Sequence, residues 1–299
     1  SYMKHAIALC KKAGFTLSKD TYDFLKTKHA MVHFALEEQL FDMWARTVDL
    51  SSFDVRQMNE AATAPEMRYI TKCLGDLKGK RVVDLGCGLG EASVYFALLG
   101  ANVTAVDLSL GMLDVVKRLA KKYHVSVAVK QAAVEYLKFP RSEKFDVFYA
   151  GNVFHHNDIE KSLSRITPYL SKQGKVVCWE PVAYNPVINI YRNLARKVRS
   201  YDEQPIRMSD IDIFRKHFRH VDVQWFWLTT LLIFIIMILV ERRNPNKERL
   251  WKSVVRESDA WSWLYVPLSK LDTLLLTVFP FLRPLCWNVV IVASDPIRT

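Results

Sequence analysis

The stretch Val82-Val-Asp-Leu-Gly-Cys-Gly-Leu-Gly-Glu91 decides which fold this chain adopts. It begins with an apolar run of the kind that forms a buried parallel strand. Three glycines follow at alternate positions, where a sharp turn and the close approach of a ligand both require the absence of a Cβ. A helical pattern then runs to Leu99, and residues 102–107 form a second strand that ends in Asp107. Strand, glycine turn, helix, strand and acid make the first unit of a nucleotide-binding α/β sheet, in which the acid would bind ribose hydroxyls.

The spacing of the glycines narrows the choice of ligand. Gly86, Gly88 and Gly90 depart from the dinucleotide pattern Gly-x-Gly-x-x-Gly, because the third glycine comes one residue early. Asp84 stands just before the turn, where a negative charge would repel a pyrophosphate and would suit a ligand with a positive end. The stretch resembles motif I of the class I S-adenosylmethionine (SAM) methyltransferases, which commonly reads Asp-x-Gly-x-Gly-x-Gly.

The resemblance implies that this first unit holds SAM as the cofactor. Asp84 would lie near the methionine moiety, residues 86–90 would pass under the ligand, and Asp107 would hold the ribose. Six further residues are implied beside the cofactor: Cys87, Leu108, Met112, Val134, Glu135 and Asn152. The alternative is a Rossmann-like fold whose nucleotide site is inactive or binds a different ligand.

The rest of the core alternates between strands and helices, which predicts parallel crossover units and a doubly wound, Rossmann-like α/β sheet of seven strands. The expected elements are strand 81–86, helix 91–99, strand 102–107, helix 109–123, strand 125–131, strand 145–150, helix 158–170, strand 175–180, strand 221–227 and strand 287–293. We therefore divide the chain into an N-terminal helical lid (1–72), a SAM-binding core (73–227), a hydrophobic helical insertion (228–286), and a final strand with a tail (287–299).

The N-terminal region, residues 1–72, has a helical pattern, and the chain has no glycine from Phe15 to Leu74. In class I methyltransferases the helices before motif I commonly cover the SAM pocket, so the resemblance implies a lid. Alternatively, these helices only pack on the sheet.

The third unit departs from the family pattern. Many members carry an aspartate where Ala133 stands, which meets the adenine amino group. Either Glu135 or a backbone group would have to replace that contact. The alternative is that Glu135 is an exposed helix residue without a role in binding.

The catalytic candidates follow the fourth and fifth strands. The run Asn152-Val-Phe-His-His156 resembles the N-x-x-H-H run of many small-molecule and quinone methyltransferases, and histidine is readily poised as a base near neutral pH. Glu180 and Tyr184 come at the carboxyl end of the fifth strand, on the edge where such sheets bind ligands. We therefore expect catalysis from His155, His156, Glu180 and Tyr184. Alternatively, the histidines only line the pocket, and the later residues form a solvated helix end.

The insertion is the unusual part of the chain, because the last two strands of the family fold are joined by a short turn. Residues 228–240 are almost wholly aliphatic but too few to span a bilayer. Basic residues from Arg242 to Arg256 follow, with tryptophans and a second apolar run at 271–285. This composition is typical of an interfacial membrane segment and predicts contact with an anionic membrane surface. The alternatives are a cap folded onto the core and a seam between two copies of the chain.

The charge and the cysteines limit the classes of partner. The net charge of +11 would suit nucleic acid or acidic lipid, but no recognisable nucleic-acid-binding module accompanies it. The five cysteines show neither paired nor metal-ligand spacing, which predicts reduced thiols, no metal and an intracellular protein. Lysines near the start argue against a signal peptide.

These features predict an enzyme that methylates a hydrophobic or amphipathic small molecule, such as a lipid, a prenylated ring or a lipid-linked sugar. It would act on the cytoplasmic face of a membrane as a peripheral or monotopic protein. The alternatives are a soluble, cytoplasmic natural-product methyltransferase and a non-catalytic SAM-binding subunit that activates a partner. We also expect that deleting residues 228–285 would leave SAM binding intact.

Overall fold

A computed structural model describes residues 38, 41–51, 53–194 and 204–297. Within them, seven strands form one sheet in the order β3-β2-β1-β4-β5-β7-β6, and β7 is antiparallel to both of its neighbours. The strands are β1 (Arg81–Leu85), β2 (Asn102–Asp107), β3 (Val127–Gln131), β4 (Phe145–Gly151), β5 (Leu170–Pro181), β6 (Phe218–Phe226) and β7 (Asn288–Pro296). The predicted doubly wound sheet is confirmed, whereas residues 1–37 of the expected lid lie outside the described residues.

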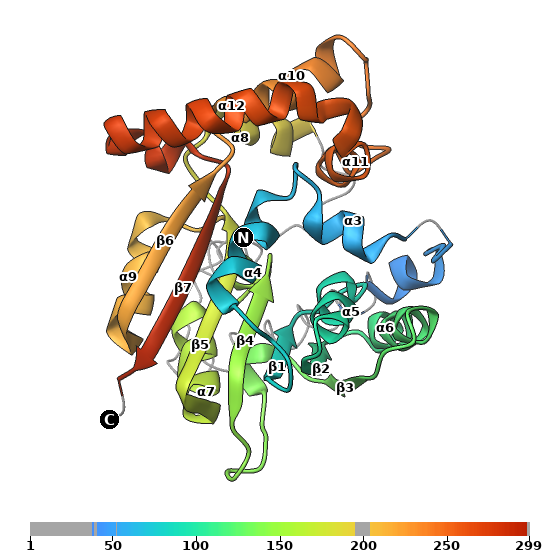
Figure 1. The fold of residues 1–299 in the computed structure, drawn as a ribbon, viewed down its shortest axis with the longest axis vertical. Helices are drawn as coiled ribbons and strands as arrows, with labels where there is room; N and C mark the ends of the chain where they lie inside the picture. Colours follow the sequence, from blue (N-terminus) through green and yellow to red (C-terminus); the bar gives the residue numbers. More distant parts are fainter. Residues whose placement is uncertain (1–37, 39–40, 52, 195–203, 298–299) are drawn as a thin grey trace, which may run out of the picture.

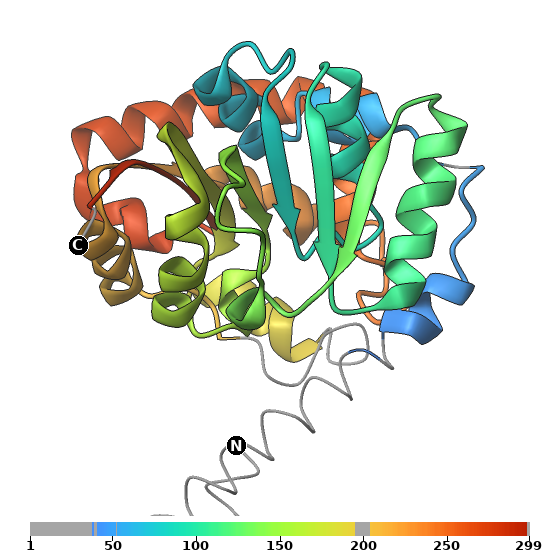
Figure 2. The same cartoon turned by 90° about the horizontal axis from the view of Figure 1, so that it is seen from below.

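Helices cover both faces of this sheet (Figures 1 and 2). One face packs against α7 (Ile159–Ile166) and α9 (Met208–His217), and the other against α4 (Pro65–Leu74), α5 (Glu91–Leu98) and α6 (Leu110–Lys122). Neighbouring residues of β1 divide between the two faces: Val82 joins the second core and Val83 the first. Burial on both faces explains why this strand is an uninterrupted apolar run.

The largest boundary differences from the sequence-based expectation concern one helix and the strand that follows it. The helix expected over 158–170 ends at Ile166, and a 3₁₀ turn, η3 (Thr167–Tyr169), leads directly into β5. Pro168 explains the early end, because a proline has no N–H to donate to the carbonyl four residues earlier. β5 begins at Leu170, which pairs with Phe145 of β4, rather than at residue 175, where the pairing with β7 starts.

The described part of the N-terminal region packs beside the glycine turn. Residues 41–46 are helical, and the carboxylate of Asp42 accepts hydrogen bonds from Ser109 Oγ (2.5 Å) and from the N–H of Gly111 (2.9 Å). These bonds hold the pKa of Asp42 below its ordinary value. Ala45 packs with Leu89 of the turn in a small apolar cluster. The segment is thereby tied to the first turn of α6; a lid role for it stays a prediction.

The insertion lies across the end of the sheet at which the parallel strands finish (Figure 1). It consists of η5 (Thr229–Leu231), α10 (Leu232–Leu239), α11 (Leu250–Arg256), α12 (Ser258–Val278) and η6 (Pro280–Leu285). The carboxylate of Asp272 on α12 accepts hydrogen bonds from both hydroxyls and both backbone N–H groups of Thr229 and Thr230. This buried carboxylate fastens α12 to the start of the insertion.

The insertion has an apolar core of its own, to which α8 (Pro186–Leu194) contributes. Its buried members are Ile188, Tyr191, Trp227, Leu231, Ile233, Phe234, Met237, Leu250, Val254, Trp261 and Tyr265. The run 228–240 is therefore covered largely by the chain itself, as in the cap alternative, and Trp261 and Tyr265 are buried rather than placed at an interface. Among the described residues, no helix combines the length and the apolar character that crossing a bilayer requires.

Much of the basic run also faces inward. Arg243 forms a bidentate ion pair with Glu257, at 2.6 and 2.8 Å, and Lys252 pairs with Glu91 of the core. The guanidinium of Arg249 lies 3.9 Å from the centre of the Trp44 ring. These three cations thus hold the insertion together or attach it to the core, which differs from the expectation that the whole run meets lipid phosphates.

Candidate functional site

The glycine turn follows β1 with three residues in the left-handed region, at φ 58° for Gly86, 50° for Gly88 and 80° for Gly90. A Cβ at Gly86 would lie 2.6 Å from a methyl of Val153, and one at Gly90 would lie 2.7 Å from a methyl of Val116. A Cβ at Gly88 would meet no atom within 4 Å. The outer glycines thus permit close packing of the turn, while the backbone at Gly88 faces open space where a ligand can approach.

Asp107, at the end of β2, lies beside this turn. Its carboxylate accepts hydrogen bonds from the N–H groups of Gly88 and Ser109, each at 2.9 Å. Two backbone donors fix the orientation of the buried carboxylate. The side chain is therefore held next to the position where the turn leaves space, which suits the ribose role predicted for it.

Asp84 is buried beneath the turn. Its carboxylate accepts a hydrogen bond from Ser93 Oγ of α5 at 2.5 Å. Burial, with the nearby charge of Asp107 as a smaller cause, raises the pKa of Asp84 to about 7. The carboxyl group therefore titrates near neutral pH, and a positively charged ligand above it would favour its ionised form.

Of the other predicted cofactor residues, Met112 and Val134 are buried, whereas Cys87 of the turn is partly exposed. Met112 is fully buried at the start of α6, and Val134 is buried in η1 (Val134–Tyr136). The Cys87 N–H donates to the carbonyl of Val106, and burial raises the pKa of the Cys87 thiol well above its ordinary value. Met112 and Val134 are therefore placed to support the walls of the site, while Cys87 belongs to the turn itself.

The remaining three lie at the strand ends with polar contacts. The carbonyl of Leu108 accepts a hydrogen bond from Gln131 Nε2 at 3.0 Å. Asn152 has φ 59°, and its N–H donates to the carbonyl of Trp179. The carboxylate of Glu135 accepts a hydrogen bond from the N–H of Asp158, the residue that caps α7. Glu135 therefore has a structural contact, and its adenine role stays a prediction.

The catalytic candidates meet where β4 and β5 end. Nδ1 of His155 lies 2.6 Å from Oε2 of Glu180, and both side chains are buried. The other oxygen of Glu180 accepts hydrogen bonds from the N–H groups of Val153 and Phe154, at 2.9 and 2.8 Å. Glu180 is thus fixed by two backbone donors, and it in turn fixes the ring of His155.

The other two catalytic candidates are placed differently. The ring of His156 lies 4.1 Å from that of His155, centre to centre, in η2 (Phe154–His156). The exposed Tyr184 accepts a hydrogen bond through its hydroxyl from the N–H of Met208, at the start of α9. The structure therefore groups His155, His156 and Glu180 and gives Tyr184 a separate contact at the surface.

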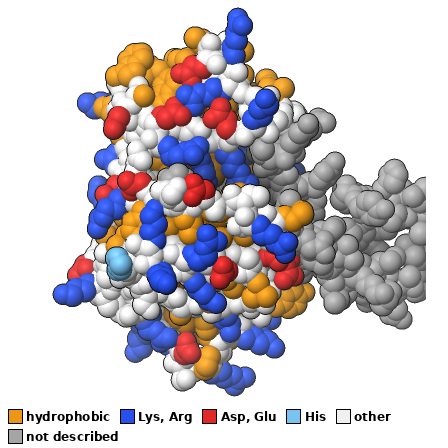
Figure 3. Space-filling view, turned by 90° about the vertical axis from the view of Figure 1, so that its right-hand side faces the viewer, with side chains coloured by type: hydrophobic (Ala, Val, Ile, Leu, Met, Phe, Trp, Pro, Cys, Tyr) orange, Lys and Arg blue, Asp and Glu red, His pale blue; other side chains and the backbone are white. Residues whose placement is uncertain are grey.

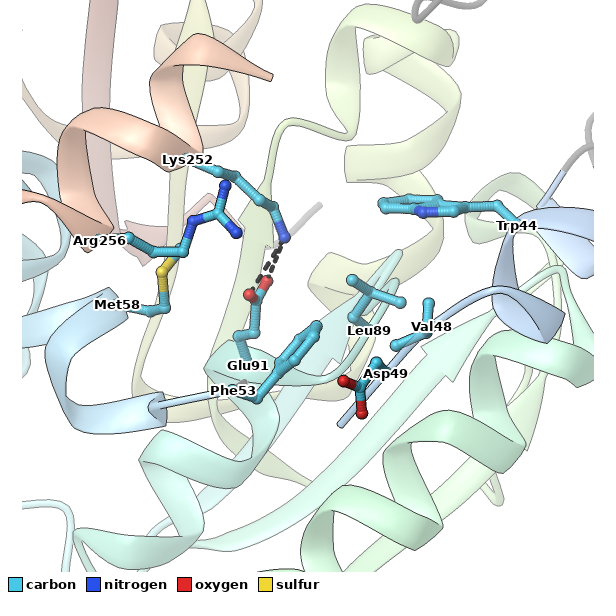
Figure 4. Close-up of a pocket in the computed structure, with 9 residues that line it drawn as sticks. All are labelled: Trp44, Val48, Asp49, Phe53, Met58, Leu89, Glu91, Lys252 and Arg256. Atoms are coloured by element: carbon cyan, nitrogen blue, oxygen red, sulfur yellow. Dashed lines mark hydrogen bonds and ion pairs between the residues drawn. The ribbon is translucent and has the colours of Figure 1, made fainter. Parts of the chain in front are cut away.

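A cavity of about 220 Å³ lies between the glycine turn, the N-terminal segment and α11 (Figure 4). Its lining residues are Trp44, Val48, Asp49, Phe53, Met58, Leu89, Glu91, Lys252 and Arg256. In the close-up, Lys252 points from α11 to Glu91, with Nζ 2.8 Å from Oε2 (Figure 4). The insertion therefore forms a wall beside the glycine turn, which the sequence did not indicate because these two partners are far apart along the chain.

A second unpredicted feature is the buried carboxylate of Glu66 on α4. It accepts hydrogen bonds from Trp227 Nε1 at 2.8 Å and from Asn288 Nδ2 at 2.7 Å. Burial raises the pKa of Glu66 above its ordinary value. One side chain of the core thus holds Trp227, which directly precedes the insertion, and Asn288, the first residue of β7 after it.

Comparison with known proteins agrees with this architecture. Residues 83–178 match the family described as a methyltransferase domain. The ubiquinone biosynthesis O-methyltransferase of Alkalilimnicola ehrlichii is 33% identical over 118 residues, which cover 40% of this chain and 48% of that protein. The protein of the same name from Bordetella parapertussis is 30% identical over 143 residues, which cover 45% of this chain and 59% of that protein. The chain spans about half the length of these curated relatives.

Among solved structures, Haemonchus contortus phosphoethanolamine N-methyltransferase 2, in complex with phosphomonomethylethanolamine and S-adenosylhomocysteine, has a similar fold. The TM-score is 0.51 at 20% identity, and the match covers 78% of this chain and 53% of that chain. At this identity the likeness concerns the fold alone. From the strand order, the glycine turn with its acids and the matched family, we conclude that the chain contains a class I SAM-dependent methyltransferase domain.

Proposed function

We propose that this protein transfers the methyl group of SAM to a hydroxyl of a hydrophobic or amphipathic small molecule, of which a quinone-type ring is one class. The observation that carries this proposal is the His155–Glu180 pair, on the sheet edge that the glycine turn shares. The named relatives act as O-methyltransferases in ubiquinone biosynthesis, which supports a hydroxyl acceptor.

The residues of the glycine turn suit the cofactor. The open space at Gly88 leaves room for a ligand against the backbone, and Asp107 offers carboxylate oxygens for ribose hydroxyls. Asp84 lies beneath the turn, where the positive charge of a bound ligand would favour its ionised form. When bound, SAM supplies a methyl group on a positively charged sulfur. The chain would contribute mainly by holding cofactor and acceptor in line.

The pair supplies a base for the acceptor hydroxyl. A carboxylate can only accept hydrogen bonds. Because Nδ1 of His155 faces Oε2 of Glu180, we assign the proton of the neutral ring to Nδ1. This tautomer makes Nε2 the basic nitrogen of the ring, which would take the proton of the acceptor hydroxyl. The carboxylate then stabilises the resulting imidazolium, as the aspartate does in a Ser-His-Asp triad.

A membrane surface is the setting that we propose for this reaction. Beyond the buried core of the insertion, α12 and η6 carry eight exposed apolar side chains: Trp263, Val266, Leu271, Leu274, Val278, Phe279, Phe281 and Leu285. From 263 to 285 the only acid is Asp272, which is buried, whereas Lys270 and Arg283 are exposed. Hydrophobic side chains also gather at the end of the molecule formed by the insertion (Figure 3). An exposed apolar patch flanked by cations suits an anionic bilayer.

Methyl transfer from labelled SAM to a membrane lipid extract tests the reaction. We expect labelled product with the wild type, and a rate at least about 10²-fold lower with His155→Ala but not with Lys161→Ala, an exposed residue of α7. Transfer only to water-soluble acceptors would favour the natural-product alternative. SAM binding without transfer to any acceptor would favour the activator subunit.

Vesicle binding tests the membrane setting separately. We expect the protein to pellet with vesicles that contain anionic phospholipid, and the double variant Leu274→Ser/Phe281→Ser to bind about tenfold more weakly. The matched control, Leu239→Ser/Val240→Ser, removes two exposed apolar side chains from the end of α10 and should change binding less. Wild-type protein that stays in the supernatant at low salt would contradict the membrane setting.

A further inference from the structure

The short helix α11 contacts three parts of the core that lie far apart in sequence. Trp251 packs edge-on against Trp179 of β5, with ring centres 6.3 Å apart. Lys252 pairs with Glu91, and the neighbouring Arg249 stacks on Trp44 of the N-terminal segment. Three closely spaced positions of the insertion therefore reach the end of one strand, the start of one helix and the segment packed on α6.

These contact points surround the glycine turn. Glu91 follows Gly90 directly and begins α5, while Trp179 precedes Glu180 on β5. In open α/β sheets the ligand lies beyond the carboxyl ends of the parallel strands. α12 runs across this end of the sheet and α11 lies at one end of α12, above α3 (Val55–Glu60), so the insertion extends over the side of the sheet on which the cofactor would lie (Figure 1).

The backbone of α11 is also fastened to the core. Thr63 Oγ1 donates a hydrogen bond to the carbonyl of Val254 at 3.0 Å, and Gln57 Nε2, on α3 (Val55–Glu60), donates to the carbonyl of Arg256 at 2.8 Å. These bonds fix the C-terminal half of α11. The Lys252–Glu91 pair fixes the side near the turn, and its two side chains are only 15% and 21% exposed.

We propose that α11 is the roof of the cofactor site, and that the Lys252–Glu91 ion pair is the latch that slows the release of SAM. This inference rests on the proposed function, since it takes SAM as the ligand. The hydrophobic insertion then belongs to the cofactor site as well as to the acceptor site. Its removal should weaken SAM binding, contrary to what the sequence suggested.

Lys252 is a positioning residue in this proposal, so the decisive measurement is the dissociation rate of SAM in stopped flow. Lys252→Met keeps the length of the side chain and removes its charge. We expect SAM to dissociate about three to ten times faster, because a partly buried ion pair to the turn is lost. The control is Glu257→Gln, which breaks the Arg243 ion pair within the insertion and should leave the rate unchanged.

A charge exchange separates the latch from general destabilisation. The double variant Glu91→Lys/Lys252→Glu should restore slow dissociation, whereas each single variant should not. A dissociation rate in Lys252→Met within twofold of the wild type would overturn the proposal. So would equal acceleration by Glu257→Gln, or a double variant that releases SAM as fast as the single ones. Absence of SAM binding by the wild type would instead overturn the proposed function.

Discussion

The carboxyl edge of the sheet is lined by polar side chains, whereas the insertion that covers it consists mainly of apolar ones. At the edge, buried carboxylates are held by backbone donors, as Asp107 and Glu180 are. In the insertion, apolar side chains form a separate core, and a second set stands exposed on its outer side. We therefore expect the few fixed polar atoms of the edge to set the chemistry, and the apolar surface of the insertion to set which acceptors reach it.

The sharpest test of the polar edge is Glu180→Gln. The amide keeps the shape of the side chain but removes the charge. Its NH₂ group cannot accept a hydrogen bond from Nδ1–H of His155. We expect kcat to fall about 10²–10⁴-fold, with the SAM dissociation constant nearly unchanged in calorimetry. A kcat close to that of the wild type would mean that the pair only supports the fold.

Two phenylalanines of the insertion test the distinction between its buried and exposed apolar groups. Phe234 is 3% exposed and Phe281 is 74% exposed. Phe234→Ala should lower the free energy of unfolding by about 3–5 kcal/mol, because it leaves a cavity in the insertion core. Phe281→Ala should change it by less than about 0.5 kcal/mol. Urea titrations of both variants measure this, and equal effects would contradict a separate insertion core.

Asp84 gives the stability of the polar edge a pH dependence of its own. Its pKa is raised to about 7 in the folded state from an ordinary value of 3.8, so the folded protein binds this proton more tightly. Stability should therefore fall as the pH rises from about 4 to about 7, by up to about 4 kcal/mol, and then level off. Asp84→Asn, which cannot ionise, should lose this part of the dependence. Urea titrations at pH 5 and pH 8 measure this. If the midpoint changes by the same amount in the wild type and in Asp84→Asn, Asp84 is not the group responsible.

The smallest of the expected effects concerns the ribose contact. Asp107→Ala should weaken SAM binding by about 1.5–3 kcal/mol, or about tenfold or more, because hydrogen bonds to a charged group are lost. Asp114→Ala, which removes an exposed acid from α6, is the control. Calorimetry measures the SAM affinity of both variants, and equal affinities would mean that Asp107 does not contact the cofactor.

The sequence predicted which polar residues lie at the edge of the sheet because its signals are local, and their roles in binding and catalysis stay predictions. The glycines, Asp107 and the paired histidines each lie within a few residues of a strand end, and the order of strands and helices then brings them to one edge. The roles of individual residues were harder to predict. The carboxylate of Glu135 accepts a hydrogen bond from the N–H of Asp158, and a contact of this kind cannot be predicted from residue spacing.

The insertion was predicted less well because hydrophobicity alone does not say what covers a helix. The sequence of α10 is apolar all round, which is typical of a helix buried in protein as much as of one in lipid. The exposed apolar side chains lie on α12, where an outer stripe and a buried stripe share one helix. Nor could the sequence pair Lys252 with Glu91, 161 positions away.

The hydrogen bonds of Glu66 to Trp227 and Asn288 have a consequence for how such a chain can evolve. They clamp the two residues that bound the insertion to one fixed point of the core. The entropy of closing a loop between fixed ends grows slowly, by about 0.6 kcal/mol for each doubling of its length. With its ends clamped, the segment between them can lengthen, shorten or be exchanged as a cassette while the sheet keeps its register, so that a lineage can acquire new acceptors without rebuilding its catalytic domain.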